Sequence, residues 1–167
     1  AGERRARLLE RGDGDHLVAI AMDEPAVPRH LQAPLRDLAY AAAVCRAAAD
    51  ALETADAADV VSALAGIHER DLAHLRRLGA GAGLAPAEAD RDEVSAARGQ
   101  LQLAQWREHD RAGVAIVRET EERVTRAYER MRDDPALPGE FRTLAGAALE
   151  ELRRRHRRLD AAIRLAG

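Results

Sequence analysis

Apolar residues recur at alternating steps of three and four along four long segments of this chain, and this periodicity limits the fold more than any other feature. Such spacing places apolar side chains on one face of an α-helix. We therefore expect long helices over residues 34–54, 56–78, 110–132 and 139–165, and a shorter one over 91–108. The segments between them, notably 79–83 and 133–139, hold the glycines and prolines that end helices.

The composition favours the same fold class. Hydrophobic residues make up 47% of the chain but aromatic residues only 2%. Alanine and leucine are strong helix formers, whereas the residues that strands prefer are scarce. Because short links join long helices, we expect an antiparallel four-helix bundle in a single domain over residues 31–167. Residues 1–30, which end in a segment broken by Pro25 and Pro28, are expected to form an N-terminal arm.

The charge and the cysteine content limit which cellular compartment and which partners can be expected. The formal net charge is −3, which gives no electrostatic reason to expect nucleic acid or an anionic membrane as a partner. No apolar stretch approaches the roughly 20 residues that span a bilayer, and no signal peptide is visible. A single cysteine allows no intrachain disulfide. We expect a cytoplasmic protein that self-associates as a homodimer or a larger homo-oligomer. A further protein partner is possible.

The run of arginines within residues 153–158 resembles a nucleic-acid patch when it is read linearly. On a helix these side chains fan around the cylinder, with Glu150, Glu151 and Asp160 beside them. We therefore interpret the run as a solvated face with salt bridges. Trp106, the only tryptophan, is expected at the core or its boundary.

Most positions on the expected inward faces are apolar. The face of segment 34–54 is wholly so, and Cys45 on it is expected to be a small buried hydrophobe and not a catalytic thiol. Its members are Leu35, Leu38, Ala42, Cys45, Ala49 and Leu52.

Ionisable residues interrupt the inward faces of the other three long helices. Asp71 and His74 lie on the face that also holds Leu64, Ile67 and Leu78. A neighbouring ridge, with Val61, Leu64, His68, Leu72 and Leu75, is more apolar, so the rotation of this helix stays open. Glu121 interrupts the face made by Val114, Val117, Val124, Tyr128 and Met131. His156 interrupts the face made by Ala145, Ala148, Leu152, Leu159 and Ile163.

Two interpretations of these four residues are possible. Asp71, His74, Glu121 and His156 offer two carboxylates and two imidazoles, a donor set that suits a divalent metal such as Zn, Fe or Mn. Alternatively, they form a metal-free polar network. Burying an unpaired carboxylate costs several kcal/mol, so Glu121 would then pair with Arg153 or His156.

Several short stretches resemble an uncharacterised bacterial family of ferritin-like proteins of unknown function. They are residues 118–122, Ala127-Tyr128, Leu137-Pro138, Leu149 and residues 155–159, together with the helix end at 69–83. The resemblance covers residues 31–165. It implies an antiparallel four-helix bundle with one long crossover connection, residues 79–109, that contains the short helix.

Catalytic ferritin-like proteins hold two metals with one Glu from each of two helices and a Glu-x-x-His pair from each of the other two. By resemblance, Asp71 and His74 would replace one such pair, and Glu121 would supply a lone Glu. His156 would be the histidine of the second Glu-x-x-His pair, but Arg153 stands at the position where the glutamate of that pair is expected. The first long helix offers no Glu on its face.

Because these ligands are missing, we expect a non-catalytic ferritin-like bundle that acts as a structural or protein-interaction module. The alternative is a metal-binding ferritin-like protein, with a degenerate di-iron or a mononuclear site and an oxidoreductase or metal-handling role.

Overall fold

The computed structural model describes residues 26–84, 87–106 and 110–165. These residues form α1 (Ala26–Ala51), α2 (Ala55–Gly79), the short 3-10 helix η1 (Ala80–Ala82), α3 (Arg91–Trp106), α4 (Asp110–Asp133) and α5 (Gly139–Leu165). No strand occurs in these ranges, which confirms the all-α fold class. None of the described helices has a stretch that is long and apolar enough to cross a membrane.

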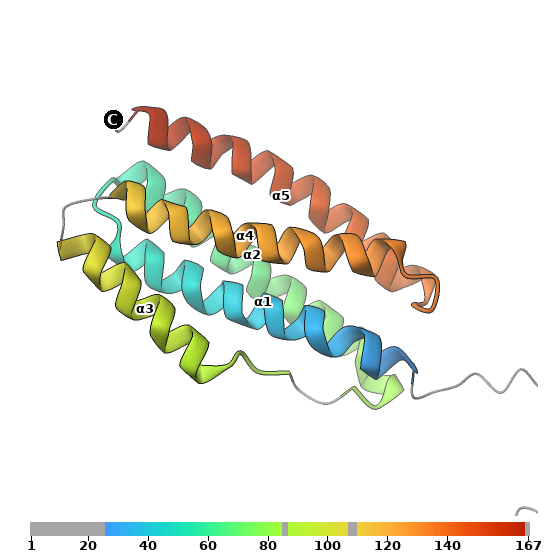
Figure 1. The fold of residues 1–167 in the computed structure, drawn as a ribbon. Helices are drawn as coiled ribbons and strands as arrows, with labels where there is room; N and C mark the ends of the chain where they lie inside the picture. Colours follow the sequence, from blue (N-terminus) through green and yellow to red (C-terminus); the bar gives the residue numbers. More distant parts are fainter. Residues whose placement is uncertain (1–25, 85–86, 107–109, 166–167) are drawn as a thin grey trace, which may run out of the picture.

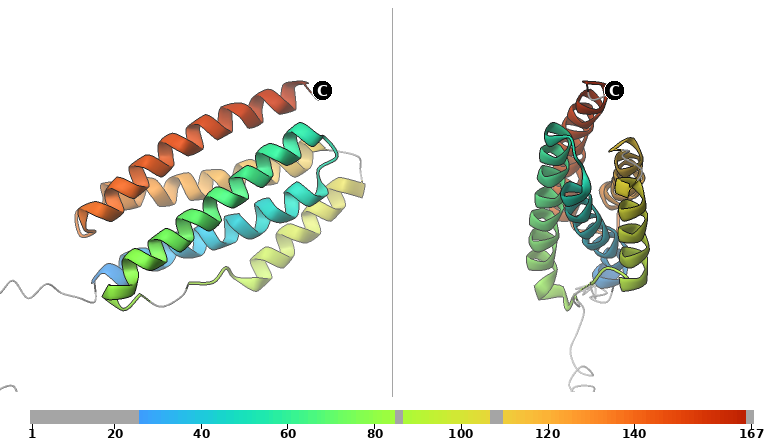
Figure 2. Two further views of the ribbon diagram at one scale, coloured as in Figure 1. Left: turned by 180° about the vertical axis from the view of Figure 1, so that it is seen from behind. Right: turned by 90° about the vertical axis from the view of Figure 1, so that its left-hand side faces the viewer.

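The four long helices enclose a common core, with α1 and α5 each in contact with both α2 and α4 (Figure 1). α1 and α2 are antiparallel, as are α4 and α5 (Figure 1). α2 and α4 point the same way, so the chain has to travel back along the molecule between them. α3 lies on that path and packs against α1 and α4, on the side away from α2 (Figure 2).

The core is built mainly from leucine, valine and alanine. Ala41, Ala48, Ala65 and Ala145 are completely buried, and side chains this small let helices approach closely. Tyr128 and Phe141 are the largest of the fully buried side chains among the described residues. Few rings are therefore needed to fill this core, which accounts for the low aromatic content.

α1 begins at Ala26, eight positions before the predicted start at Pro34. Pro28 falls in the first turn, where a backbone N–H has no helical partner in any case, so it is compatible with a helix start. Pro34 removes one hydrogen bond inside the helix, but Leu31 and Leu35 on either side of it are completely buried. Residues 26–30 of the predicted arm thus belong to α1, and residues 1–25 lie outside the described residues.

α2 ends at Gly79, as the glycine-rich segment predicts. The backbone N–H of Leu84 donates to the carbonyl of Gly79 at 3.2 Å, and a Cβ at position 79 would overlap the Leu84 side chain. Gly83 has φ 71°, a left-handed conformation that favours glycine. These two glycines turn the chain away from α2 toward α3.

The prediction that Trp106 lies in the core or at its boundary is wrong, because its side chain is 84% exposed. α3 packs through Ala97, Leu101 and Ala104, which share one helical face. Trp106 follows Ala104 by two positions, so it points to the opposite side of the helix.

Tryptophan fluorescence should therefore report solvent and not packing. We expect the emission of native Trp106 to resemble that of free indole and to be quenched readily by iodide. Trp106→Phe should change the free energy of unfolding by less than about 0.5 kcal/mol, as is usual for exposed positions. Blue-shifted emission protected from iodide, or a larger loss on urea denaturation, would contradict this placement.

Candidate functional site

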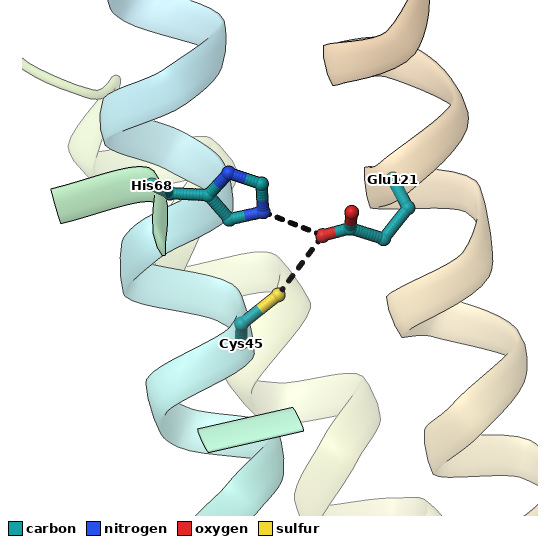
Figure 3. A group of neighbouring side chains, drawn as sticks. All are labelled: Cys45, His68 and Glu121. Atoms are coloured by element: carbon teal, nitrogen blue, oxygen red, sulfur yellow. Dashed lines mark hydrogen bonds and ion pairs between the residues drawn. The ribbon is translucent and has the colours of Figure 1, made fainter. Parts of the chain in front are cut away.

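Each of the four long helices contributes one ionisable side chain to a single cluster in the core. Its members are Cys45 from α1, His68 from α2, Glu121 from α4 and His156 from α5. Figure 3 shows Cys45 and His68 directed at the same carboxylate oxygen of Glu121. Cys45 and Glu121, which are 76 positions apart in the sequence, thus meet in the core.

Glu121 is the centre of this cluster. Its Oε1 lies 2.6 Å from His68 Nε2 and 3.5 Å from Cys45 Sγ, and its Oε2 lies 2.9 Å from His156 Nε2. An ionised carboxylate can only accept hydrogen bonds, so both Nε2 atoms and the thiol act as donors. Glu121 therefore receives a donor from each of the other three long helices.

The charge of Glu121 is retained despite burial. Its side chain is only 2% exposed, and this desolvation raises the pKa. The charge of His68 and the hydrogen bonds from His156 and His68 lower it more strongly, and the resulting pKa is about 2. Glu121 is consequently a carboxylate at neutral pH.

Cys45 behaves in the opposite way. Burial raises the pKa of its thiol well above the usual value, and the neighbouring Glu121 carboxylate raises it further. The thiol is therefore protonated at neutral pH and donates its hydrogen to Glu121. The prediction that Cys45 is buried is confirmed.

His68 has one unsatisfied nitrogen. With Nε2 donating to Glu121, the other ring nitrogen, Nδ1, has no hydrogen-bond partner among the described residues, although the side chain is completely buried. Leaving a buried polar atom unpaired costs about 1–3 kcal/mol. Such an atom in a folded core calls for a physical reason, and a functional role of the side chain is one of the usual ones.

The rotation of α2, which the sequence left open, is settled by burial. The more apolar ridge faces inward, with Val61, Leu64, His68 and Leu75 completely buried. His74 is exposed. The histidine that meets Glu121 is accordingly His68 and not His74.

Asp71 is buried but takes part in a different interaction. Its Oδ2 accepts a hydrogen bond of 2.8 Å from the Tyr128 hydroxyl, and its Oδ1 pairs with Arg70. Burial and the Asp71 charge raise the pKa of Tyr128, so its hydroxyl stays protonated as the donor. Asp71 and His74 both line a groove of about 510 Å³ between α2 and α5, with Glu140 and Glu151 on its other side.

Of the four residues predicted as ligands, the structure brings together only Glu121 and His156.

The pairing of Glu121 with His156 is confirmed, whereas the alternative pairing with Arg153 is wrong. Arg153 points outward and pairs with Glu150, one turn earlier on α5. Arg154 and Arg155 pair with Glu151 in the same way, which confirms the interpretation of this run as a salt-bridged surface.

Three members of the cluster could hold a metal ion. One donor atom each from Cys45, His68 and Glu121 lies within 4.8 Å of the other two, and all three residues are buried. In the described part of the chain, no other group of this kind occurs. A thiolate, an imidazole and one carboxylate suit a single transition-metal ion, whereas a ferritin-like pair of metals needs several carboxylates.

Two of these residues were not among the predicted ligands. Cys45 lies on the inward face of α1, as predicted, but the prediction of a small hydrophobe misses its polar role, since no partner is close to it in sequence. His68 stood on the competing ridge of α2. The sequence does contain a sign that Cys45 and His68 could be ligands, because each places a polar atom on the most apolar face of its helix.

Comparisons with known proteins identify no relative of this chain: no family model matches it, and no curated protein or solved structure does so either.

Proposed function

We propose that this protein binds one divalent transition-metal ion in the core of its helical bundle, through Cys45, His68 and Glu121. The observation that supports the proposal is the convergence of polar side chains from four helices on one buried point. When bound, the ion would link α1, α2 and α4, and so stabilise the fold.

The donor set favours Zn²⁺ or Fe²⁺ over Mn²⁺. Thiolate and imidazole are ligands of the softer divalent ions, whereas Mn²⁺ prefers carboxylate and water. Glu121 is the only carboxylate in the cluster. A single ion is therefore the better fit, and the role we propose is metal holding and not oxygen activation.

The direction of the helices favours the ferritin-like topology for this bundle. α2 and α4 are parallel, and α3 lies along the connection between them, as a long crossover over residues 79–109 would require. The cluster departs from the ferritin-like ligand pattern in using a cysteine from the first helix. We therefore propose a ferritin-like bundle in which one ion occupies a differently built site.

Metal content tests this proposal. Protein purified without chelator and then loaded with Zn²⁺ or Fe²⁺ is expected to retain close to one ion per chain by elemental analysis. His68→Ala should lose the ion, because it removes a ligand. His74→Ala is the matched control, since this exposed histidine on the same helix touches no member of the cluster. Equal retention by both variants would contradict the assignment.

A second candidate function is that of a metal-free structural bundle that self-associates. The observation in its favour is that His68 Nδ1 is the one buried side-chain polar atom without a hydrogen-bond partner among the described residues, so the cluster is nearly satisfied without an ion. Wild-type protein that stays metal-free after loading would favour this function over the first.

A further inference from the structure

The ligands of the proposed ion are not equally covered. The side chains of His68 and Glu121 are 0% and 2% exposed, and Cys45 is completely buried. His156 differs, because 32% of its side chain is exposed. The solvent-facing side of the cluster is therefore the α5 side, where His156 stands.

His156 also contacts a different oxygen of Glu121 from the one that the other two ligands meet, so it is not placed to coordinate the ion itself. Cys45 and His68 both meet Oε1 of Glu121, whereas His156 Nε2 donates to Oε2. A histidine N–H that holds the free oxygen of a ligating carboxylate orients that carboxylate and does not coordinate the metal. His156 fits this role as the molecule stands.

A tetrahedral ion has four coordination positions, and three protein donors fill only three of them. Zinc sites with four protein ligands are closed, whereas sites with three keep a position for water or another small molecule. Here the fourth long helix contributes a positioning residue in place of a ligand. The remaining position would consequently be reached past the partly exposed His156 ring, since the other three members are covered.

We propose that the ion held by Cys45, His68 and Glu121 keeps one coordination position for a small exogenous ligand of the water, hydroxide or azide class, on the side of His156. This inference rests on the proposed metal binding. It assigns His156 as a positioning residue that holds Glu121 Oε2 beside that position.

Cobalt substitution tests the inference directly, because the visible spectrum of Co²⁺ reports its ligands. With Co²⁺ bound, wild-type protein should show a thiolate-to-metal charge-transfer band, and azide should shift the ligand-field bands in a saturable way. His156→Ala should keep the charge-transfer band and the four-coordinate intensity, and should admit imidazole as well as azide. His74→Ala should behave as wild type.

Two results would overturn the inference while leaving metal binding intact. One is a wild-type Co²⁺ spectrum that azide does not change at saturating concentration. The other is a His156→Ala spectrum that differs from wild type as expected for the loss of a ligand and is restored by imidazole, which would make His156 the fourth ligand. Absence of any Co²⁺ band in wild-type protein would instead refute the proposed metal binding itself.

Discussion

Glu121→Ala is expected to lower the free energy of unfolding of the metal-free protein by about 3–5 kcal/mol, the range for removing one partner of a buried ion pair. The substitution removes the acceptor for three donors. It leaves both ring nitrogens of His68 without a partner inside the core. It should also abolish binding of the proposed ion, and urea denaturation with and without Zn²⁺ measures both effects.

The neighbouring Glu122 provides a matched control. It is exposed, and its interaction is an ion pair of 3.7 Å with Arg126 on the surface of α4. Glu122→Ala should therefore cost less than about 1 kcal/mol, as is usual for surface pairs. Similar losses for the two variants would contradict the central place given to Glu121.

Acid should destabilise the metal-free protein through the same residue. The pKa of Glu121 falls from 4.5 to about 2 on folding, so folding favours its ionised form. The resulting stability is fully present above pH 4.5 and is lost as the pH falls toward 2. A shift of this size corresponds to about 3 kcal/mol.

The difference in the free energy of unfolding between wild type and Glu121→Gln, followed as a function of pH, separates the contribution of Glu121 from that of the other carboxylates. We expect the free energy of unfolding of wild type to fall more steeply with decreasing pH between about 5 and 2 than that of Glu121→Gln. Curves that run parallel over this range would show that Glu121 is not stabilised as a carboxylate in the fold.

The helices were predictable because their signals are local. The ends of α2 and α4 and the start of α3 follow from glycines, prolines and periodicity within a few residues. The predicted start of α1 is eight positions late because Pro28 reads as a break in the sequence, although a proline is tolerated in the first turn of a helix. The exposure of Trp106 depends on which face of α3 meets α1 and α4, and the sequence of α3 alone does not contain that information.

The candidate site was only partly predictable, for a related reason. Glu121 and His156 each interrupt a clear apolar face, so their inward position could be read from spacing. His68 and His74 lie on two overlapping ridges of α2, and the choice between them is made by packing against the other helices. The polar role of Cys45 depends on a carboxylate that is 76 positions away in the sequence.

Calorimetric titration of metal-free protein with Zn²⁺ tests the central claim most directly. The protonated Cys45 thiol has to lose its proton to bind the ion, so binding should release protons and tighten by up to tenfold per pH unit while the thiol remains protonated. We predict one ion per chain in wild type and a loss of affinity of more than about tenfold in Cys45→Ala. No binding by wild type, or binding that Cys45→Ala leaves unchanged, would contradict a metal centre built on this cluster.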